Sequence, residues 1–314
     1  MGWKVLVTAP YMQTVMDRFR PVFAENDIQV FAPPVAERFE EVDLLQWVGD
    51  VDGVICGDDR FTELVLRSAP KLKVISKWGT GIDSIDGEAC RRLGIAVRNT
   101  PNAFTEPVAD SVIGYILCFA RNIPWMDRSM KEGTWRKIPS RALRECVLGV
   151  IGVGNVGKAV VRRALALGMH VIGNDIVEMP ADFLAATGLE MATKQGLLRG
   201  ADFVSLNCDL NSTSYHLMGD SEFALMKSTA VLINTARGPI VAERALEKAL
   251  QEERIAGAAL DVFEVEPLPA DSPLRRMDNV LLAPHNANSS PQAWERVHWS
   301  TIDNLLQELR RSRQ

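Results

Sequence analysis

The sequence has few of the features that mark secreted, metal-binding, membrane-spanning or nucleic-acid-binding proteins. Its five cysteines are odd in number, widely scattered and without metal-ligand spacing, so we expect reduced thiols, no disulfide and no metal site. It has no run of about 18 apolar residues, and the first residues lead directly into a strand rather than through a signal peptide. The net charge is −5, and the one basic run is Arg310–Arg313. We therefore expect a cytoplasmic protein that has no nucleic-acid or membrane partner.

The composition is that of a globular protein that is large enough for two domains. The 314 residues are 47% hydrophobic and 24% charged, and they contain no internal repeat. In the first third of the chain, short apolar strands alternate with helical stretches, which predicts a small parallel α/β unit. The expected strands are 5–8, 28–31, 53–56, 74–76 and 95–98.

The segment 147–175 has the order of elements that dinucleotide binding requires. An apolar strand, 146–151, ends in a turn with Gly152, Gly154 and Gly157, and a helix, 156–168, follows. The first glycine allows the tight turn, the second lets the backbone approach a pyrophosphate, and the third lets the helix pack close to the strand. The N–H groups at the amino end of the helix favour a phosphate. The alternative is an ordinary turn, since a glycine triplet alone is weak evidence.

Asp175 indicates which dinucleotide is bound. A second strand, 169–173, places Asp175 near its carboxyl end, where a carboxylate can accept hydrogen bonds from the ribose hydroxyls of adenosine. The next three residues, 176–178, include no arginine that could receive a 2′-phosphate. The sequence therefore predicts NAD as the cofactor rather than NADP. The alternative is that Asp175 is a solvated turn residue.

Four further strands, 203–206, 230–233, 257–261 and 280–283, complete the predicted cofactor sheet. The predicted fold class is α/β, with a Rossmann-type doubly wound parallel sheet domain, a smaller flavodoxin-like α/β substrate domain and a cleft between them. We expect residues 101–286 to form the NAD-binding domain. Residues 1–100 and 287–314 form the substrate domain, since the helical segment 292–309 can fold back onto it. The apolar helical segment 106–121 suits burial against a neighbouring element or a second subunit, which predicts a homodimer.

Three polar residues follow predicted strands on the cofactor side of the sheet, where open α/β sheets bind ligands: Arg237, Glu266 and His285. The planar guanidinium of Arg237 can hold a carboxylate with two parallel hydrogen bonds. The imidazole of His285 has an unperturbed pKa of about 6.5, which suits proton exchange near neutral pH. From the residues alone, the alternatives are a surface ion pair for Arg237, a structural role for His285, and a catalytic role for Glu264 in place of Glu266.

With these residues and several motifs, the chain resembles the D-isomer specific 2-hydroxyacid dehydrogenase family, of the phosphoglycerate dehydrogenase and hydroxypyruvate or glyoxylate reductase type. The resemblance extends over nearly the whole length. Besides the glycine turn and Asp175, the motifs that carry it are 79–86 (GTGIDSID), 99–101 (NTP), 108–110 (VAD), 234–238 (NTARG), 257–263 (GAALDVF), 266–267 (EP) and 284–285 (PH).

The resemblance implies an oxidoreductase that transfers a hydride between NAD(H) and a small D-2-hydroxy or 2-oxo acid. It implies that Arg237 orients the substrate, that His285 exchanges the proton, and that Glu266 rather than Glu264 is the partner of His285, because the family's catalytic carboxylate precedes a proline. The implied substrate contacts are Trp78, Gly79 and Arg237. The implied cofactor contacts are Thr80, Gly152, Gly154, Asn155, Val156, Gly157, Asp175, Cys208, Thr235, Ala236 and Asp261.

The chain departs from the family's pattern at Asn102, Asp209 and Asn286, where Gly, Pro and a small apolar residue are frequent, so the acid is not specified. Lys77, Arg98 and Arg141 could contact a substrate phosphate, although solvated surface charges are the more common role of such residues. One competing hypothesis is a non-enzymatic NAD sensor that keeps the same three residues. Another is a formate or phosphite dehydrogenase, although related formate enzymes carry Gln in place of Glu266. Because the sequence ends at Gln314, we expect no regulatory domain and no serine feedback.

Overall fold

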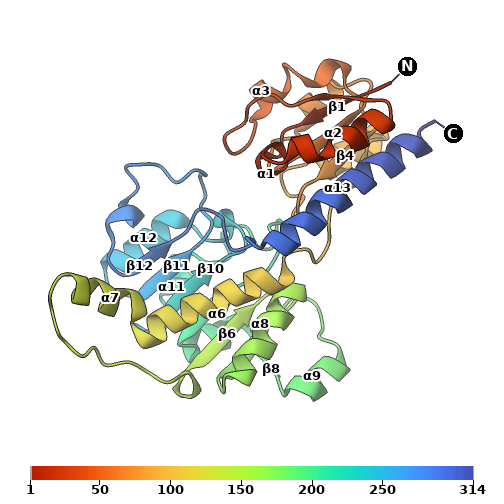
Figure 1. Cartoon of the computed structure of the whole chain (residues 1–314). Coiled ribbons are helices and arrows are strands. Elements are labelled where there is room, and N and C mark those ends of the chain that lie inside the picture. Colours follow the sequence, from red (N-terminus) through yellow and green to blue (C-terminus); the bar gives the residue numbers. More distant parts are fainter. Residues whose placement is uncertain (1, 314) are drawn as a thin grey trace. The chain divides into compact units, whose positions relative to one another are not determined.

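The computed structural model describes residues 2–313 and divides the chain into two compact units, each built around one parallel sheet (Figure 1). Unit 1 comprises Met1–Phe104 and Ser290–Gln314, and unit 2 comprises Thr105–Ser289. These divisions lie a few residues beyond the expected boundaries after residues 100 and 286. The α/β class predicted from the alternation of strands and helices is confirmed.

The sheet of unit 1 has five parallel strands in the order β2-β1-β3-β4-β5. This is the order of flavodoxin-like folds. The strands are short and apolar because helices cover both faces of a parallel sheet, and β3 is buried at all four positions. Their bounds are β1 (Trp3–Val7), β2 (Ile28–Phe31), β3 (Gly53–Cys56), β4 (Val74–Lys77) and β5 (Ala96–Arg98).

The helices of unit 1 include one that comes from the far end of the sequence, α13 (Pro291–Arg311), which packs on β3, β4 and β5 (Figure 1). The Ser290 hydroxyl accepts a hydrogen bond from Ala293 N and caps this helix. Gly53 allows the close approach, because a Cβ there would lie 2.8 Å from Leu305 Cδ1. The other helices are α1 (Pro10–Gln13), α2 (Met16–Glu25), α3 (Glu41–Leu44), α4 (Glu63–Arg67) and α5 (Gly87–Leu93), together with the short 3-10 helix η1 (Val48–Asp50).

The sheet of unit 2 has seven parallel strands in the order β12-β11-β10-β9-β6-β7-β8. The chain starts in the middle at β6, runs outward to one edge, and then returns to β9 and runs to the other edge. This doubly wound topology is the predicted Rossmann type. The strands are β6 (Val147–Ile151), β7 (His170–Asn174), β8 (Glu190–Met191), β9 (Phe203–Leu206), β10 (Val231–Asn234), β11 (Gly257–Leu260) and β12 (Val280–Leu282).

Two hydrophobic cores cover the two faces of this sheet, because successive strand residues point to opposite sides. Val150 packs with α6 and α8 in one core, whereas the next residue, Ile151, packs in the core with α10 and α12. The α-helices of unit 2 are α6 (Thr105–Arg121), α7 (Ile123–Lys131), α8 (Asn155–Ala166), α9 (Ala181–Thr187), α10 (Lys194–Gly200), α11 (Asp220–Phe223) and α12 (Glu243–Gln251). The unit also has the short 3-10 helices η2 (Leu143–Glu145), η3 (Gly238–Ile240) and η4 (Pro273–Arg276).

None of the helices formed by residues 2–313 combines the length and the apolar character that are needed to cross a bilayer.

A buried histidine joins α13 to the end of β4. The indole Nε1 of Trp78 donates a hydrogen bond to His298 Nδ1 over 2.9 Å, and the two side chains are 4% and 3% exposed. Burial lowers the pKa of His298 below its ordinary value of 6.5, Glu295 opposes this shift, and Arg18 reinforces it. The folded state therefore binds a proton at His298 more weakly than the unfolded state.

This linkage predicts that stability falls when the solution becomes acidic. The contribution of neutral His298 is fully present above the ordinary pKa of a histidine and is lost as the pH falls below it. We expect the urea concentration at the midpoint of unfolding, measured by tryptophan fluorescence, to be lower at about pH 5.5 than at pH 7.5. His298→Gln, which keeps a hydrogen-bond acceptor, should reduce the difference, and the exposed His170→Gln should leave it unchanged. An unchanged pH dependence in His298→Gln would contradict the assignment.

Candidate active site

The glycine turn of unit 2 connects β6 to α8, and each of its glycines has a different environment. Gly152 has φ +86°, and a Cβ there would lie 2.5 Å from Cys208 N. A Cβ on Gly157 would lie 2.1 Å from Gly152 O, so only glycine lets α8 start so close to the strand. A Cβ on Gly154, by contrast, would have open space around it. The turn thus presents accessible backbone at Gly154, next to the amino end of α8, where a pyrophosphate fits.

Asp175 lies directly after β7 and is held by the backbone. Its Oδ2 accepts a hydrogen bond from Val153 N over 2.6 Å, and its Oδ1 accepts one from Val177 N over 2.9 Å. These bonds fix the carboxylate against the glycine turn. Each carboxylate oxygen can accept more than one hydrogen bond, so the fixed group is still able to receive ribose hydroxyls.

Other predicted cofactor contacts lie along the same edge of the sheet of unit 2. Asn155 and Val156 begin α8. Cys208 belongs to the loop after β9 and lies beside Gly152 of the glycine turn. Burial raises the pKa of the Cys208 thiol to about 11, so this side chain is neutral. The hydroxyl of Thr235, after β10, is buried and finds no hydrogen-bond partner among residues 2–313. A buried polar atom of this kind fits a site that a polar ligand completes.

Arg237 lies in a loop that other residues hold in an extended form. Asn234 braces the loop, since its side chain donates to Arg237 O over 2.9 Å and accepts from Ala236 N over 3.1 Å. A Cβ on Gly238 would lie 1.9 Å from the carbonyl carbon of Phe263. Gly238 therefore allows the loop of Arg237 to pack directly against the loop that leads to Glu266. The Arg237 guanidinium itself is half-buried and donates to Ala236 O.

Glu266 and His285 form a hydrogen-bonded pair. Glu266 Oε2 lies 3.0 Å from His285 Nδ1, and Glu266 Oε1 accepts from Phe263 N over 2.9 Å. Both side chains are about one fifth exposed, 16% for Glu266 and 21% for His285. The geometry fixes the imidazole orientation and leaves Nε2 as the nitrogen that faces away from the carboxylate.

The backbone of His285 is fixed by the buried Asp261. The main-chain oxygen of Asp261 accepts from His285 N, and its carboxylate accepts from Asn286 N and Ala287 N, each over 2.8 Å. Burial raises the pKa of Asp261, and the two backbone donors oppose that shift. This clasp holds His285 at φ +50°, a conformation that residues with a side chain seldom adopt.

The structure also distinguishes the two candidate glutamates. Glu264 has a different partner, because its Oε1 lies 2.6 Å from Nε2 of His216. Glu264 N further donates to Glu243 over 3.1 Å. His216 therefore has an acidic partner of its own, which the sequence did not indicate, because 48 positions separate the pair.

The predicted substrate contacts Trp78 and Gly79 and the predicted cofactor contact Thr80 lie in unit 1, directly after β4. Trp78 is 4% exposed, and Gly79 has φ +128°. Gly79 O accepts from Thr100 N, and Thr80 Oγ1 donates to Thr100 O. The segment is thus a fixed turn at the carboxyl edge of the sheet, where parallel sheets bind ligands. Asn102, which stands where Gly is frequent in the family, has φ +61°.

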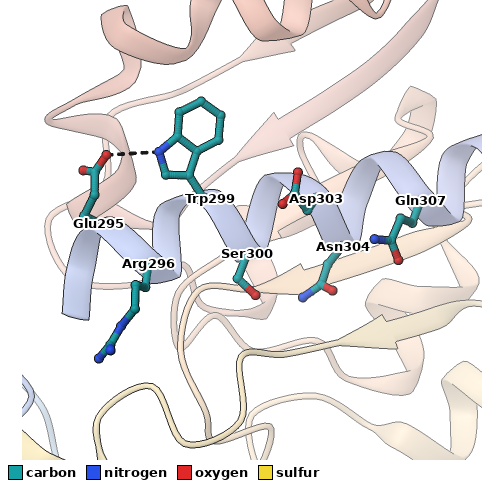
Figure 2. A pocket seen from close by; sticks show the side chains of 7 residues that line it. All are labelled: Glu295, Arg296, Trp299, Ser300, Asp303, Asn304 and Gln307. Atoms are coloured by element: carbon teal, nitrogen blue, oxygen red, sulfur yellow. Dashed lines mark hydrogen bonds between the residues drawn. The ribbon is translucent and has the colours of Figure 1, made fainter. Parts of the chain in front are cut away.

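A pocket of unit 1 lies elsewhere, along α13. It measures about 510 Å³ and is lined by side chains of α13, which Figure 2 shows on successive turns of the helix: Glu295, Arg296, Trp299, Ser300, Asp303, Asn304 and Gln307. It contains none of the predicted catalytic residues. Among residues 2–313, no group of three or more His, Cys, Asp and Glu side chains is arranged so that it could hold a metal ion.

Comparisons with known proteins agree with this architecture. The model of the family described as D-isomer specific 2-hydroxyacid dehydrogenase, NAD binding domain, matches residues 113–287. A glyoxylate reductase of Korarchaeum cryptofilum is 38% identical, with 84% of this chain and 81% of that protein covered. A D-3-phosphoglycerate dehydrogenase of Methanocaldococcus jannaschii is 37% identical over 98% of this chain, which spans 57% of that protein. The crystal structure of D-lactate dehydrogenase from Aquifex aeolicus with NAD and lactic acid has a TM-score of 0.86 and 26% identity, covering 96% of this chain and 93% of that one.

The Rossmann-type sheet, the glycine turn and these matches define an NAD-dependent oxidoreductase. More particularly, the chain belongs to the D-isomer specific 2-hydroxyacid dehydrogenase family. The resemblance drawn from the motifs and the prediction of NAD are therefore confirmed, and the hypothesis of a non-enzymatic sensor is set aside.

The position of Asp175 leads to a prediction about cofactor preference. Asp175→Ala removes two acceptors for the ribose hydroxyls, and one hydrogen bond to a charged group is worth about tenfold or more in affinity. We expect the Kd for NADH, measured by fluorescence titration, to rise about tenfold or more, while the Kd for NADPH changes less. Glu178→Ala, an exposed acid three positions away, is the matched control. An equal loss for both cofactors would show that Asp175 only supports the turn.

Proposed function

We propose that the chain interconverts a small D-2-hydroxy acid and its 2-oxo acid, with Arg237, Glu266 and His285 as the catalytic residues. The observation that carries this proposal is the Glu266–His285 pair. Glu266 follows β11, His285 follows β12, and Arg237 follows the adjacent strand β10. All three residues belong to the carboxyl edge of the sheet whose other strands bear the glycine turn and Asp175. When bound, the nicotinamide ring supplies or accepts the hydride.

His285 is the group that moves the proton. Its Nδ1 faces Glu266, so Nε2 gives a proton to the developing alkoxide when the 2-oxo acid is reduced and takes it back when the hydroxy acid is oxidised. The Glu266 carboxylate favours the imidazolium form and keeps the ring in one orientation. Asp261 contributes by fixing the backbone from His285 to Ala287.

Arg237 binds and orients the acid. A guanidinium can donate two parallel hydrogen bonds to a carboxylate or polarise a carbonyl oxygen. The bracing by Asn234 and the close contact at Gly238 hold the loop in place before substrate arrives. We propose that the N–H groups of Gly79 and Thr80 in unit 1 serve as further donors for the substrate carboxylate, with Trp78 held beside them because its own N–H donates to Cys56 O over 2.9 Å.

Unit 2 acts as the cofactor domain in this proposal, and unit 1 as the substrate domain. The matched NAD-binding region, residues 113–287, lies within unit 2. We further propose that the protein acts in the cytoplasm without a nucleic-acid or membrane partner. The five cysteines are free, which suits a reducing compartment.

The proposal predicts that His285→Ala loses turnover but keeps the cofactor. A general acid–base residue contributes about 10²–10⁴-fold, so kcat for NADH oxidation with a 2-oxo acid, followed at 340 nm, should fall by about that factor. The Kd for NADH should stay close to that of the wild type.

The matched control for this variant is His216→Ala. It removes a histidine of the same unit that is also paired to a glutamate, Glu264, and it should leave kcat little changed. Full activity in His285→Ala, or an equal loss in both variants, would refute the catalytic assignment.

We also propose that the protein is a homodimer. The segment after α6 carries large apolar side chains that are exposed in the single chain, Ile123 at 49%, Met130 at 51% and Trp135 at 85%. Trp135 lies in the part of this segment, 134–142, that has neither helix nor strand. Apolar side chains concentrated in this way suit a contact with a second copy.

If this segment forms the contact, Trp135→Glu should shift the molecule from dimer to monomer in sedimentation velocity, because it places a charge in an apolar interface. Trp47→Glu is the matched control, since Trp47 is a 40% exposed tryptophan in unit 1. A monomeric wild-type protein, or a dimer that persists in Trp135→Glu, would speak against the proposed interface.

A further inference from the structure

Four aromatic rings gather at the carboxyl edge of the sheet in unit 1, around the turn that follows β4. The ring of Trp78 lies 5.1 Å from that of Tyr11, 5.7 Å from that of Phe104 and 6.0 Å from that of Trp294, and the Tyr11 and Trp294 rings are 4.8 Å apart. We call these residues the aromatic cluster. They come from α1, the turn after β4, the segment after β5 and the start of α13.

The aromatic cluster borders the backbone that we propose for the substrate carboxylate. Trp78 immediately precedes Gly79, and a Cβ on Gly79 would lie 3.7 Å from the Phe104 ring. Trp78 and Phe104 are only 4% and 8% exposed, and the hydrogen bond to His298 fixes the Trp78 indole. They form a rigid support. Tyr11 and Trp294 are half-buried, so they are the members that can contact a ligand.

Trp294 has a second property that points to a ligand. Its Nε1 atom is buried, and no acceptor among residues 2–313 receives its hydrogen. Buried indole N–H groups normally have a partner. The ring therefore does not have the environment of a side chain that serves only the core.

The charges at this edge do not suit a phosphate. Lys77, the last residue of β4, is 4% exposed, and its ammonium already pairs with Asp58 over 2.8 Å. Arg38 and Arg60 both pair with Glu40. Each of these three bases is therefore already paired with an acid of the same unit. A phosphate dianion would have to displace an acid from one of these bases, against the attraction between the paired charges.

We propose that the aromatic cluster selects the side chain of the 2-oxo acid, and that the preferred substrates carry an unphosphorylated, aromatic side chain. Tyr11 and Trp294 are the specificity-determining residues. An aromatic substituent on the carbon next to the carboxylate gains ring contacts there, whereas a hydrogen gains none and a phosphate finds the nearby bases already paired. This inference rests on the proposed function and names its substrate class.

The test compares kcat/KM with NADH for phenylpyruvate, glyoxylate and phosphohydroxypyruvate. We expect phenylpyruvate to be favoured over each of the others by about tenfold or more. Tyr11→Leu and Trp294→Leu should lower kcat/KM for phenylpyruvate by about tenfold, mainly through KM, and should leave glyoxylate little affected. Trp294→Phe, which keeps a ring, should retain the preference.

Trp299→Leu is the matched control. Trp299 lies on the same helix and is 43% exposed, but its ring packs edge-on against Phe19 and not against Trp78. The preference for phenylpyruvate should persist in this variant.

Three outcomes would overturn the inference: a wild-type preference for glyoxylate, a wild-type preference for phosphohydroxypyruvate, or an unchanged preference in Trp294→Leu. Each leaves the proposed reaction intact, since turnover is still measured. Bound NADH with no turnover of any 2-oxo acid would instead refute the proposed function itself.

Discussion

The arrangement of the candidate active site depends on the hydrogen bonds that Asp261 accepts from the backbone of residues 285–287. One residue at the end of β11 receives three backbone N–H groups from the chain that follows β12, so two adjacent strands end in a single fixed structure. Keeping a carboxylate buried is unfavourable, as the raised pKa of Asp261 indicates. The hydrogen bonds offset that desolvation and hold His285 in its left-handed conformation, which brings Nδ1 to Glu266.

Close backbone contacts hold in place the parts of the candidate site that these hydrogen bonds do not reach. Gly238 lets the loop of Arg237 lie directly against the loop that leads to Glu266, and Gly157 lets α8 begin directly beside Gly152. In both places a Cβ would collide with backbone atoms, which cannot move aside as a flexible side chain can. At Gly53 in unit 1, a Cβ would instead meet the end of a side chain, Leu305 Cδ1, at 2.8 Å, so the constraint there is weaker. Gly238 and Gly157 thus set the distances between elements that bear candidate site residues.

Much of the fold could be read from hydrophobic runs and turn residues. The strands β2, β3 and β9 have the expected bounds, and most others differ by one residue at an end, because apolar runs of this length are typical of buried parallel strands. The two-residue strand β8 was not predicted, since Glu190 and Met191 are exposed at the sheet's edge and carry no apolar run. The bracing of the Arg237 loop by Asn234 was also missed, although the polar residue at the end of β10 was a signal for it.

The sequence by itself determined the α/β class, the family and NAD as the cofactor, because glycine spacing, an acid after a strand and strand-end motifs are local patterns. From the residues alone both glutamates were candidates, and only the family resemblance favoured Glu266. The tertiary structure decided the contacts themselves, Glu266 with His285 and Glu264 with His216, because these pairs join residues that are 19 and 48 positions apart. It alone also brought Tyr11, Trp78 and Trp294 together. Contacts between distant segments depend on how helices and strands pack in space, and a periodic pattern along the chain does not encode which side chains then meet.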